Sequence, residues 1–80
     1  MNILAAIKMG LEARRFLTQI QKSAPEIVDV IQVGKEAIDH TLAAVADGKL
    51  TLAERDEAAN LVESFGVQMA DVIRSLPVTD

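Results

Sequence analysis

Apolar residues recur every three or four positions along nearly the whole chain, which is the spacing of helices that bury one face. Two stretches interrupt the spacing, at residues 23–25 and 47–50. The pattern therefore predicts helices over about 2–22, 25–47 and 52–76. Short connections favour antiparallel neighbours, so the chain is expected to be a single all-α domain over 1–80, an up-down-up antiparallel three-helix bundle.

Each predicted helix carries an apolar stripe suited to a shared core. The arc of the second helix is the widest, which is typical of a central helix with neighbours on two sides. The stripes consist of Ala6, Met9, Ala13, Phe16, Leu17 and Ile20 in the first helix, of Ile27, Val30, Ile31, Val33, Gly34, Ala37, Ile38, Leu42, Ala44 and Val45 in the second, and of Ala58, Leu61, Val62, Phe65, Met69, Val72, Ile73 and Leu76 in the third.

The first helix has additional apolar residues outside this stripe. Leu4 and Leu11 fall among polar residues, and Ile7 lies at the border. Irregular packing near a chain end would account for them, because exposed leucines are common. A contiguous apolar stripe also marks contact surfaces, and a domain this small gains from further burial. We therefore predict that Leu4, Ile7 and Leu11 contact a protein partner.

The junction between the second and third helices has strong boundary signals. Gly48 is suited to the left-handed residue that ends a helix, since it lacks a Cβ. Thr51 and Glu54 have the spacing of a capping box, in which each side chain bonds the other residue's amide. Ser23 and Glu26 have the same spacing and predict a second capping box at the start of the second helix, whose first turn contains Pro25.

The junction also matches the second half of a calcium loop centred on Gly48. Asp47, Thr51 and Glu54 then occupy ligand positions, but the first two ligand positions fall on Ala43 and Val45, which have no side-chain oxygen. Calcium takes six to eight oxygen ligands. The capping box explains the same residues without a cation, so no metal ligand is predicted, and cation binding is kept as an alternative.

Residues 44–54 run Ala-Val-Ala-Asp-Gly-Lys-Leu-Thr-Leu-Ala-Glu. This segment resembles the helix–turn–helix junction of tellurite-resistance-type helical domains and of small phage-encoded helical proteins. The resemblance covers only the junction, and no functional residue is carried over from it. It implies a structural module and raises the expectation of a virion component.

Composition removes several classes of chemistry. The chain has no cysteine, one histidine, and neither tryptophan nor tyrosine, so thiol catalysis and cysteine-based metal centres are excluded. His40 lies among acids on a polar face and has no predicted nucleophile beside it, so no catalytic residue and no cofactor are predicted. Gly10, Gly34 and Gly66 lie within helical patterns and indicate either close backbone approach or bends.

Charge is divided unevenly along the chain. Residues 1–24 carry four basic side chains and one acid, whereas 25–47 and 50–76 are each acidic. This division suits pairing between helices of one chain or head-to-tail alignment of copies. The net charge of −4 disfavours nucleic-acid binding. No apolar run approaches the length of a membrane span, and no signal peptide is recognised.

These observations predict a non-enzymatic, soluble helical subunit that acts through protein–protein contacts, by self-association or within a larger assembly. Its location is not determined by the sequence; the cytoplasm and a virus particle are both compatible. The alternative function is a regulatory module that binds a partner macromolecule or, at the half loop of Asp47, Gly48 and Glu54, a divalent cation.

Overall fold

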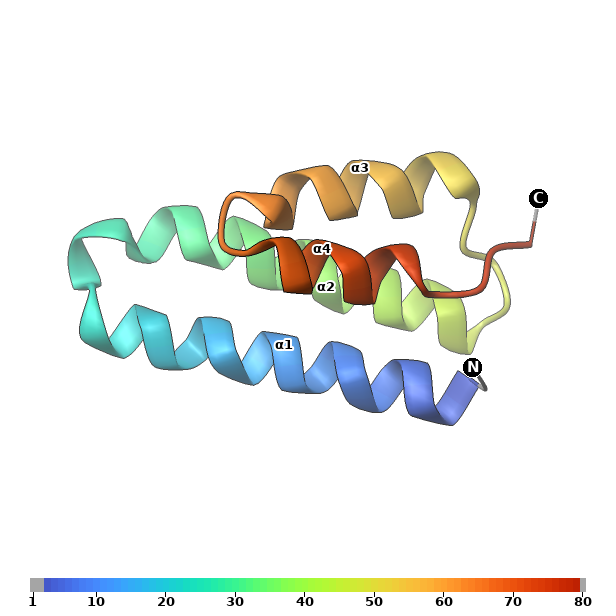
Figure 1. Ribbon diagram of the computed structural model, residues 1–80, viewed down its shortest axis with the longest axis horizontal. Helices are drawn as coiled ribbons and strands as arrows, with labels where there is room; N and C mark the ends of the chain where they lie inside the picture. The colour runs from blue at the N-terminus through green and yellow to red at the C-terminus, as the bar shows by residue number, and fades with distance from the viewer. Residues whose placement is uncertain (1–2, 80) are drawn as a thin grey trace.

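The chain folds into antiparallel helices joined by short turns (Figure 1). The computed structural model describes residues 3–79, and within them the secondary structure is entirely helical, as predicted. The helices are α1 (Ile3–Ser23), the short 3₁₀ helix η1 (Pro25–Ile27), α2 (Val28–Ala46), α3 (Leu52–Glu63) and α4 (Val67–Arg74). The chain reverses direction between successive α-helices, and the molecule measures 38 × 21 × 20 Å.

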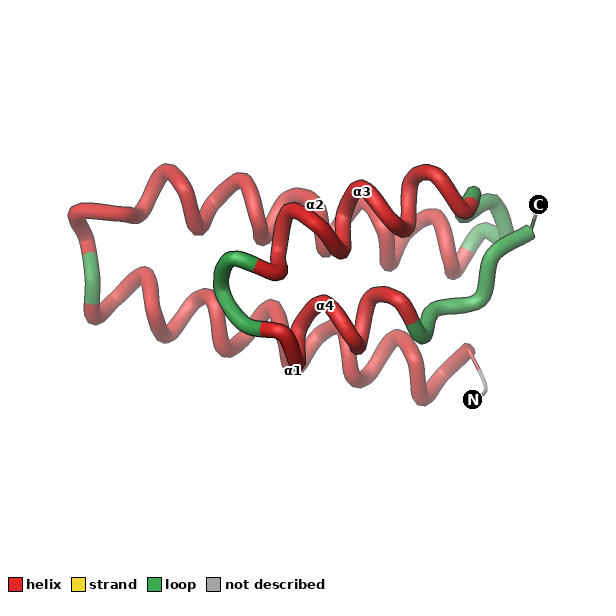
Figure 2. The backbone as a smooth tube through the Cα atoms, turned by 45° about the horizontal axis from the view of Figure 1, so that its top comes forward, coloured by secondary structure: helices red, strands yellow, loops and turns green. Residues whose placement is uncertain are grey.

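The prediction of one continuous helix over 52–76 is wrong. This segment forms two helices, α3 and α4, which pack side by side as a hairpin (Figure 2). The chain leaves helical geometry at Gly66, whose φ of 157° and ψ of 134° lie where L side chains are rarely found. The apolar stripe continues across the break because both short helices face the same core, so helical periodicity alone does not reveal the turn.

The break leaves part of the α1–α2 pair uncovered. With 12 and 8 residues, α3 and α4 are much shorter than α1 and α2, which have 21 and 19. The connected ends of α1 and α2 therefore extend beyond the α3–α4 hairpin (Figure 1). Phe16, Val30 and Val33 were predicted to lie in the core, but about half of each residue's surface is exposed.

The first connection also differs from its prediction. Ser23 does not cap the next helix; it ends α1, and its hydroxyl donates to the Gln19 carbonyl at 3.2 Å. Ala24 precedes η1 without a side-chain cap, so the predicted Ser23–Glu26 capping box is wrong. The second α-helix consequently begins at Val28, three residues later than predicted, after the 3₁₀ turn that starts at Pro25.

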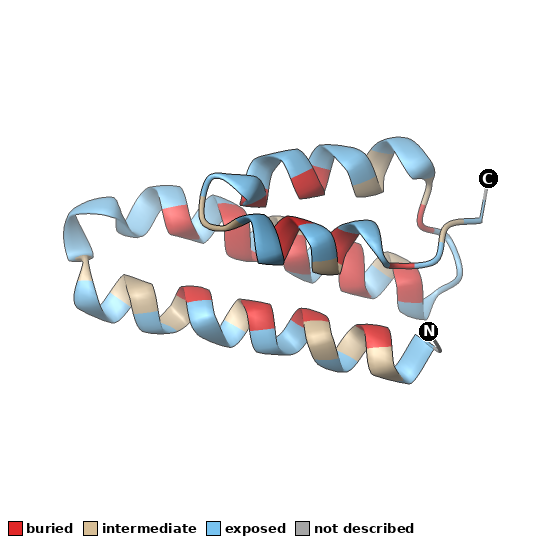
Figure 3. Cartoon of the chain, viewed as in Figure 1, coloured by how far each residue is buried: buried red, intermediate tan, exposed pale blue. Residues whose placement is uncertain are grey.

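Buried apolar side chains from all four α-helices form the core between them (Figure 3). Gly10 brings α1 close to α2, because a Cβ at this position would overlap the end of the Leu42 side chain. A Cβ on Gly34 would lie 3.0 Å from the Phe65 ring. The sequence allowed either close approach or a bend at these two glycines, and the structure shows close approach of neighbouring elements. The largest completely buried side chains of the described residues are Leu17, Ile31, Ile38, Leu50, Ile73, Leu76, Val62 and Thr41.

Replacing Gly66 with alanine tests the origin of the hairpin. Gly66→Ala places a Cβ on a strained backbone conformation, and we expect the free energy of unfolding to fall by about 1–3 kcal/mol. Urea unfolding followed by circular dichroism measures the change. Ser64→Ala, in the same exposed turn, is the control and should change stability by less than about 0.5 kcal/mol. A Gly66→Ala chain as stable as the wild type would contradict this explanation of the break.

Candidate protein-interaction surface

One face of α1 points away from the bundle and combines leucine with cationic side chains. Its residues follow one another at three-, four- and seven-residue intervals, which places them along one line on a helix. Leu4 is 80% exposed and Leu11 is 50% exposed. This surface, called here the outer stripe, consists of Leu4, Lys8, Leu11, Arg15 and Lys22.

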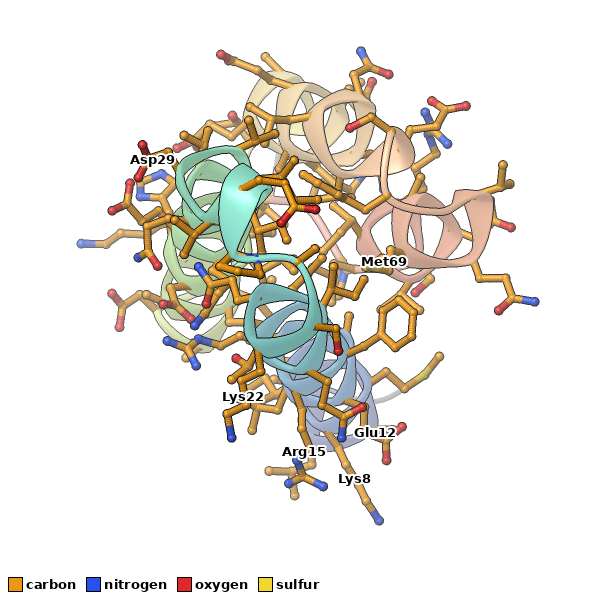
Figure 4. The ribbon with its side chains drawn as sticks, turned by 90° about the vertical axis from the view of Figure 1, so that its left-hand side faces the viewer. Lys8, Glu12, Arg15, Lys22, Asp29 and Met69 are labelled. Carbon is orange, nitrogen blue, oxygen red and sulfur yellow. The ribbon has the colours of Figure 1, made fainter. Side chains whose placement is uncertain are left out.

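The cations of the outer stripe have no partner within residues 3–79. Lys8, Arg15 and Lys22 extend outward from α1 and form neither an ion pair nor a hydrogen bond with any described residue (Figure 4). Arg14, one position away, instead donates from Nε to Asp39 on α2 at 2.7 Å. Glu12 is the one acid beside the stripe. The face is therefore basic although the whole chain is acidic.

The three residues predicted to contact a partner have different environments. Leu4 and Leu11 are exposed on the outer stripe, whereas Ile7 is half-buried and packs against the core. Ile7 lies at the border between the two faces, and the neighbouring helices cover much of its side chain. A partner contact through Leu4 and Leu11 stays a prediction, and Ile7 contributes to the packing of α1.

The α2–α3 junction has the geometry expected from its sequence. Gly48 has φ 68°, and its amide donates to Val45 while the Lys49 amide donates to Ala44 at 2.8 Å, the bonds of a Schellman motif. Thr51 then caps α3: its hydroxyl accepts from the Glu54 amide at 3.1 Å, and the Thr51 amide donates to Glu54 Oε1 at 3.2 Å. Both bonds of the predicted capping box are present.

Glu54 also connects the junction to α2. His40 Nε2 lies 3.1 Å from Glu54 Oε2, and the hydrogen bonds from His40 and from Thr51 hold the pKa of Glu54 below its ordinary value of 4.5. The carboxylate thus holds the start of α3 against α2. Both of its oxygens bond protein groups, while Ala43 and Val45 lie within α2. In the part of the chain that the structure describes, no group of three or more His, Cys, Asp and Glu side chains could hold a metal ion.

Two neighbouring depressions lie along α2 and α3, an acidic part and an apolar part. The acidic part is rimmed by Glu36, His40, Glu54 and Glu57, and it meets the apolar part at Leu61, which lines both. The two depressions are neighbours that share Leu61, and together they are called here the α2–α3 groove. Its apolar part is lined by Val30, Val33, Leu61, Ser64 and Phe65.

A second, mainly apolar groove lies between α1 and α4, lined in part by Met9, Phe16, Val67 and Val72. The sequence did not predict either groove, because most of the apolar residues that line them belong to stripes that were expected to face the core. Gly66 was the available signal, since a glycine inside a helical pattern allows a break.

No helix within residues 3–79 has the length and apolar character needed to cross a membrane. No protein-family model matches the chain, and no curated protein or solved structure is significantly similar to it. These comparisons therefore give no support to the resemblance expected from the sequence of the junction.

Acid should weaken the α2–α3 junction. Because the pKa of Glu54 is lower in the folded than in the unfolded chain, the ionised carboxylate stabilises the fold above about pH 4.5, and this contribution is lost as the pH falls through the lowered pKa. Glu54→Gln keeps a side chain able to complete the box but has no charge. Urea unfolding between about pH 6 and about pH 3 measures the free energy of unfolding of both chains. The wild type should be more stable than Glu54→Gln at about pH 6, and this difference in stability should shrink as the pH falls.

Glu57→Gln is the matched control for Glu54→Gln, because it removes one negative charge from the same helix without touching the cap. A stability difference between the wild type and Glu54→Gln that does not change with pH would contradict the role assigned to the ionised carboxylate.

Proposed function

We propose that this protein is a small, non-enzymatic assembly subunit that acts by protein–protein contact through the outer stripe of α1. The observation that carries the proposal is the exposure of Leu4 and Leu11 in line with three cations that have no partner among the described residues. An apolar strip rimmed by charge is the usual composition of a contact surface.

Burial of the exposed leucines of this surface would contribute favourable energy to association. Burial of a leucine side chain contributes about 1.5–3 kcal/mol relative to its exposed state. Cationic side chains around the leucines add orientation and faster encounter with an acidic partner, and their contribution falls with ionic strength. The outer stripe therefore favours a partner whose surface alternates apolar and acidic groups.

The proposal assigns no catalytic role to any residue. His40, the sole histidine of the chain, contacts a glutamate of the helix cap, and no nucleophile is bonded to it among residues 3–79. A place in a virus particle is the narrower form of the proposal, and it rests only on the resemblance of the junction to phage-encoded helical proteins.

A regulatory module that binds a different macromolecule would use the same stripe. The two functions differ in the mass of the isolated chain. An assembly subunit increases in mass with its own concentration, whereas a regulatory module remains at 8.6 kDa until its partner is added. No specific observation favours the divalent cation of the alternative function.

Leu11→Glu should weaken self-association. The substitution places a negative charge within the apolar part of the stripe, and we expect a loss of about 2 kcal/mol, roughly thirtyfold in Kd. Size exclusion with multi-angle light scattering over a concentration series measures the change. Circular dichroism should be unaltered, because Leu11 is half exposed in the isolated chain.

Val67→Glu is the matched control. Val67 is 62% exposed on α4, outside the outer stripe, so the same kind of substitution should leave association unchanged. If both substitutions weaken self-association equally, or if neither weakens it, the outer stripe is not the contact surface.

A further inference from the structure

We infer that the partner is a second copy of this chain, and that the outer stripe of one copy docks in the α2–α3 groove of the next. This inference rests on the proposed function and names its partner. Three properties of the two surfaces support it: their opposite charge, their matching apolar groups and their positions on different sides of the molecule.

The charges of the two surfaces are complementary. The outer stripe has Lys8, Arg15 and Lys22 without partners among the described residues, whereas Glu36, Glu54 and Glu57 rim the groove. Glu36 and Glu57 form no ion pair within residues 3–79, so they remain available to cations of another molecule. Each copy therefore offers both halves of an electrostatic contact.

The spacing of charges also matches. Lys8 and Arg15 are seven residues apart on α1, and the exposed acids Asp29 and Glu36 are seven residues apart on α2. Seven residues of helix span about 10 Å, so two helices laid side by side place both pairs opposite each other. An apolar residue lies between the two charged residues of each pair. In the outer stripe this residue is Leu11.

On α2, the apolar residue between the two acids is Val33. Together with Val30 and Leu61 it forms an exposed apolar site, called here the apolar seat. These three side chains are 50%, 57% and 38% exposed. Leu4 and Leu11 of another copy supply side chains of the kind that such a seat accepts. Docking would bury apolar groups of both surfaces, which is the main favourable term in association.

The two surfaces lie on different sides of the bundle. In Figure 4 the cations of the outer stripe extend from α1 at the bottom, while Asp29 and α2 lie at the upper left and α3 at the top. A contact between unlike surfaces is heterologous, so each copy retains a free stripe at one end and a free groove at the other. Association then continues into a chain or a closed ring rather than stopping at a dimer.

The α1–α4 groove is a weaker seat for the stripe. Its lining is mostly apolar, and the charged residue in it is Glu12, which belongs to the same helix as the stripe. It therefore lacks the row of acids that the stripe would meet. Val67→Glu, which changes this groove, should leave self-association intact.

Two single substitutions test the inference by complementation. Leu11→Glu disables the stripe and leaves the groove intact, whereas Val33→Glu disables the groove and leaves the stripe intact. Each variant alone should associate at least about tenfold more weakly than the wild type. Mixed in equal amounts, they should form a 1:1 heterodimer of twice the 8.6 kDa chain mass and no larger species. Isotope labelling of one variant and native mass spectrometry measure the composition of the dimer.

Wild-type mass that rises with concentration, together with a 1:1 complex of the two variants, supports the inference. If the wild type associates but the mixed variants stay monomeric, or if Val33→Glu associates as the wild type does, the head-to-tail contact is wrong. The proposed function then stands only if Leu11→Glu alone still weakens association, with the outer stripe contacting a surface other than the groove. If the wild type stays monomeric at every concentration, self-association through the stripe is wrong. Binding of the monomer to vesicles containing anionic phosphatidylglycerol would then make a lipid surface the ligand and overturn both.

Discussion

The non-helical backbone at Gly66 is the constraint on which the rest of the structure depends. It divides an amphipathic segment into α3 and α4 and packs them together, with Arg74 bonding Asn60 at 3.1 Å and Glu63 at 3.0 Å across the hairpin. Because the hairpin is short, it covers the part of the α1–α2 pair nearer the α2–α3 junction and leaves the connected ends exposed (Figure 1). The apolar seat at Val30 and Val33 exists for this reason.

The same arrangement separates the structural and the interactive parts of the chain. Small residues allow close packing in the interior, where Gly10 approaches Leu42, and the Thr51–Glu54 cap holds the corner between α2 and α3. The stripe and the groove expose apolar groups, together with charged groups that form no ion pair with another described residue: Lys8, Arg15, Lys22, Glu36 and Glu57. A chain of this size gains stability by burying such surfaces against a neighbour.

Local signals predicted much of the fold. Helical periodicity located α1 and α2. Gly48, Thr51 and Glu54 defined the junction between α2 and α3, because each of these three residues acts through bonds to nearby backbone. The break at Gly66 was missed because the apolar stripe passes through it unchanged, so the exposed Phe16 and Val33 were assigned to the core. Leu4 and Leu11 were located as an unusual surface, but the groove depends on where the hairpin ends, which periodicity does not determine.

The most direct test of this account is the distance between α3 and α4 in solution. The chain has no cysteine, so Asp56→Cys with Ser75→Cys accepts spin labels at those two positions alone. The hairpin predicts neighbouring helices about 8–10 Å apart and strong dipolar broadening between the labels. A continuous helix would separate these residues by about 28 Å, and that distance in the monomer would contradict the hairpin and the groove that depends on it.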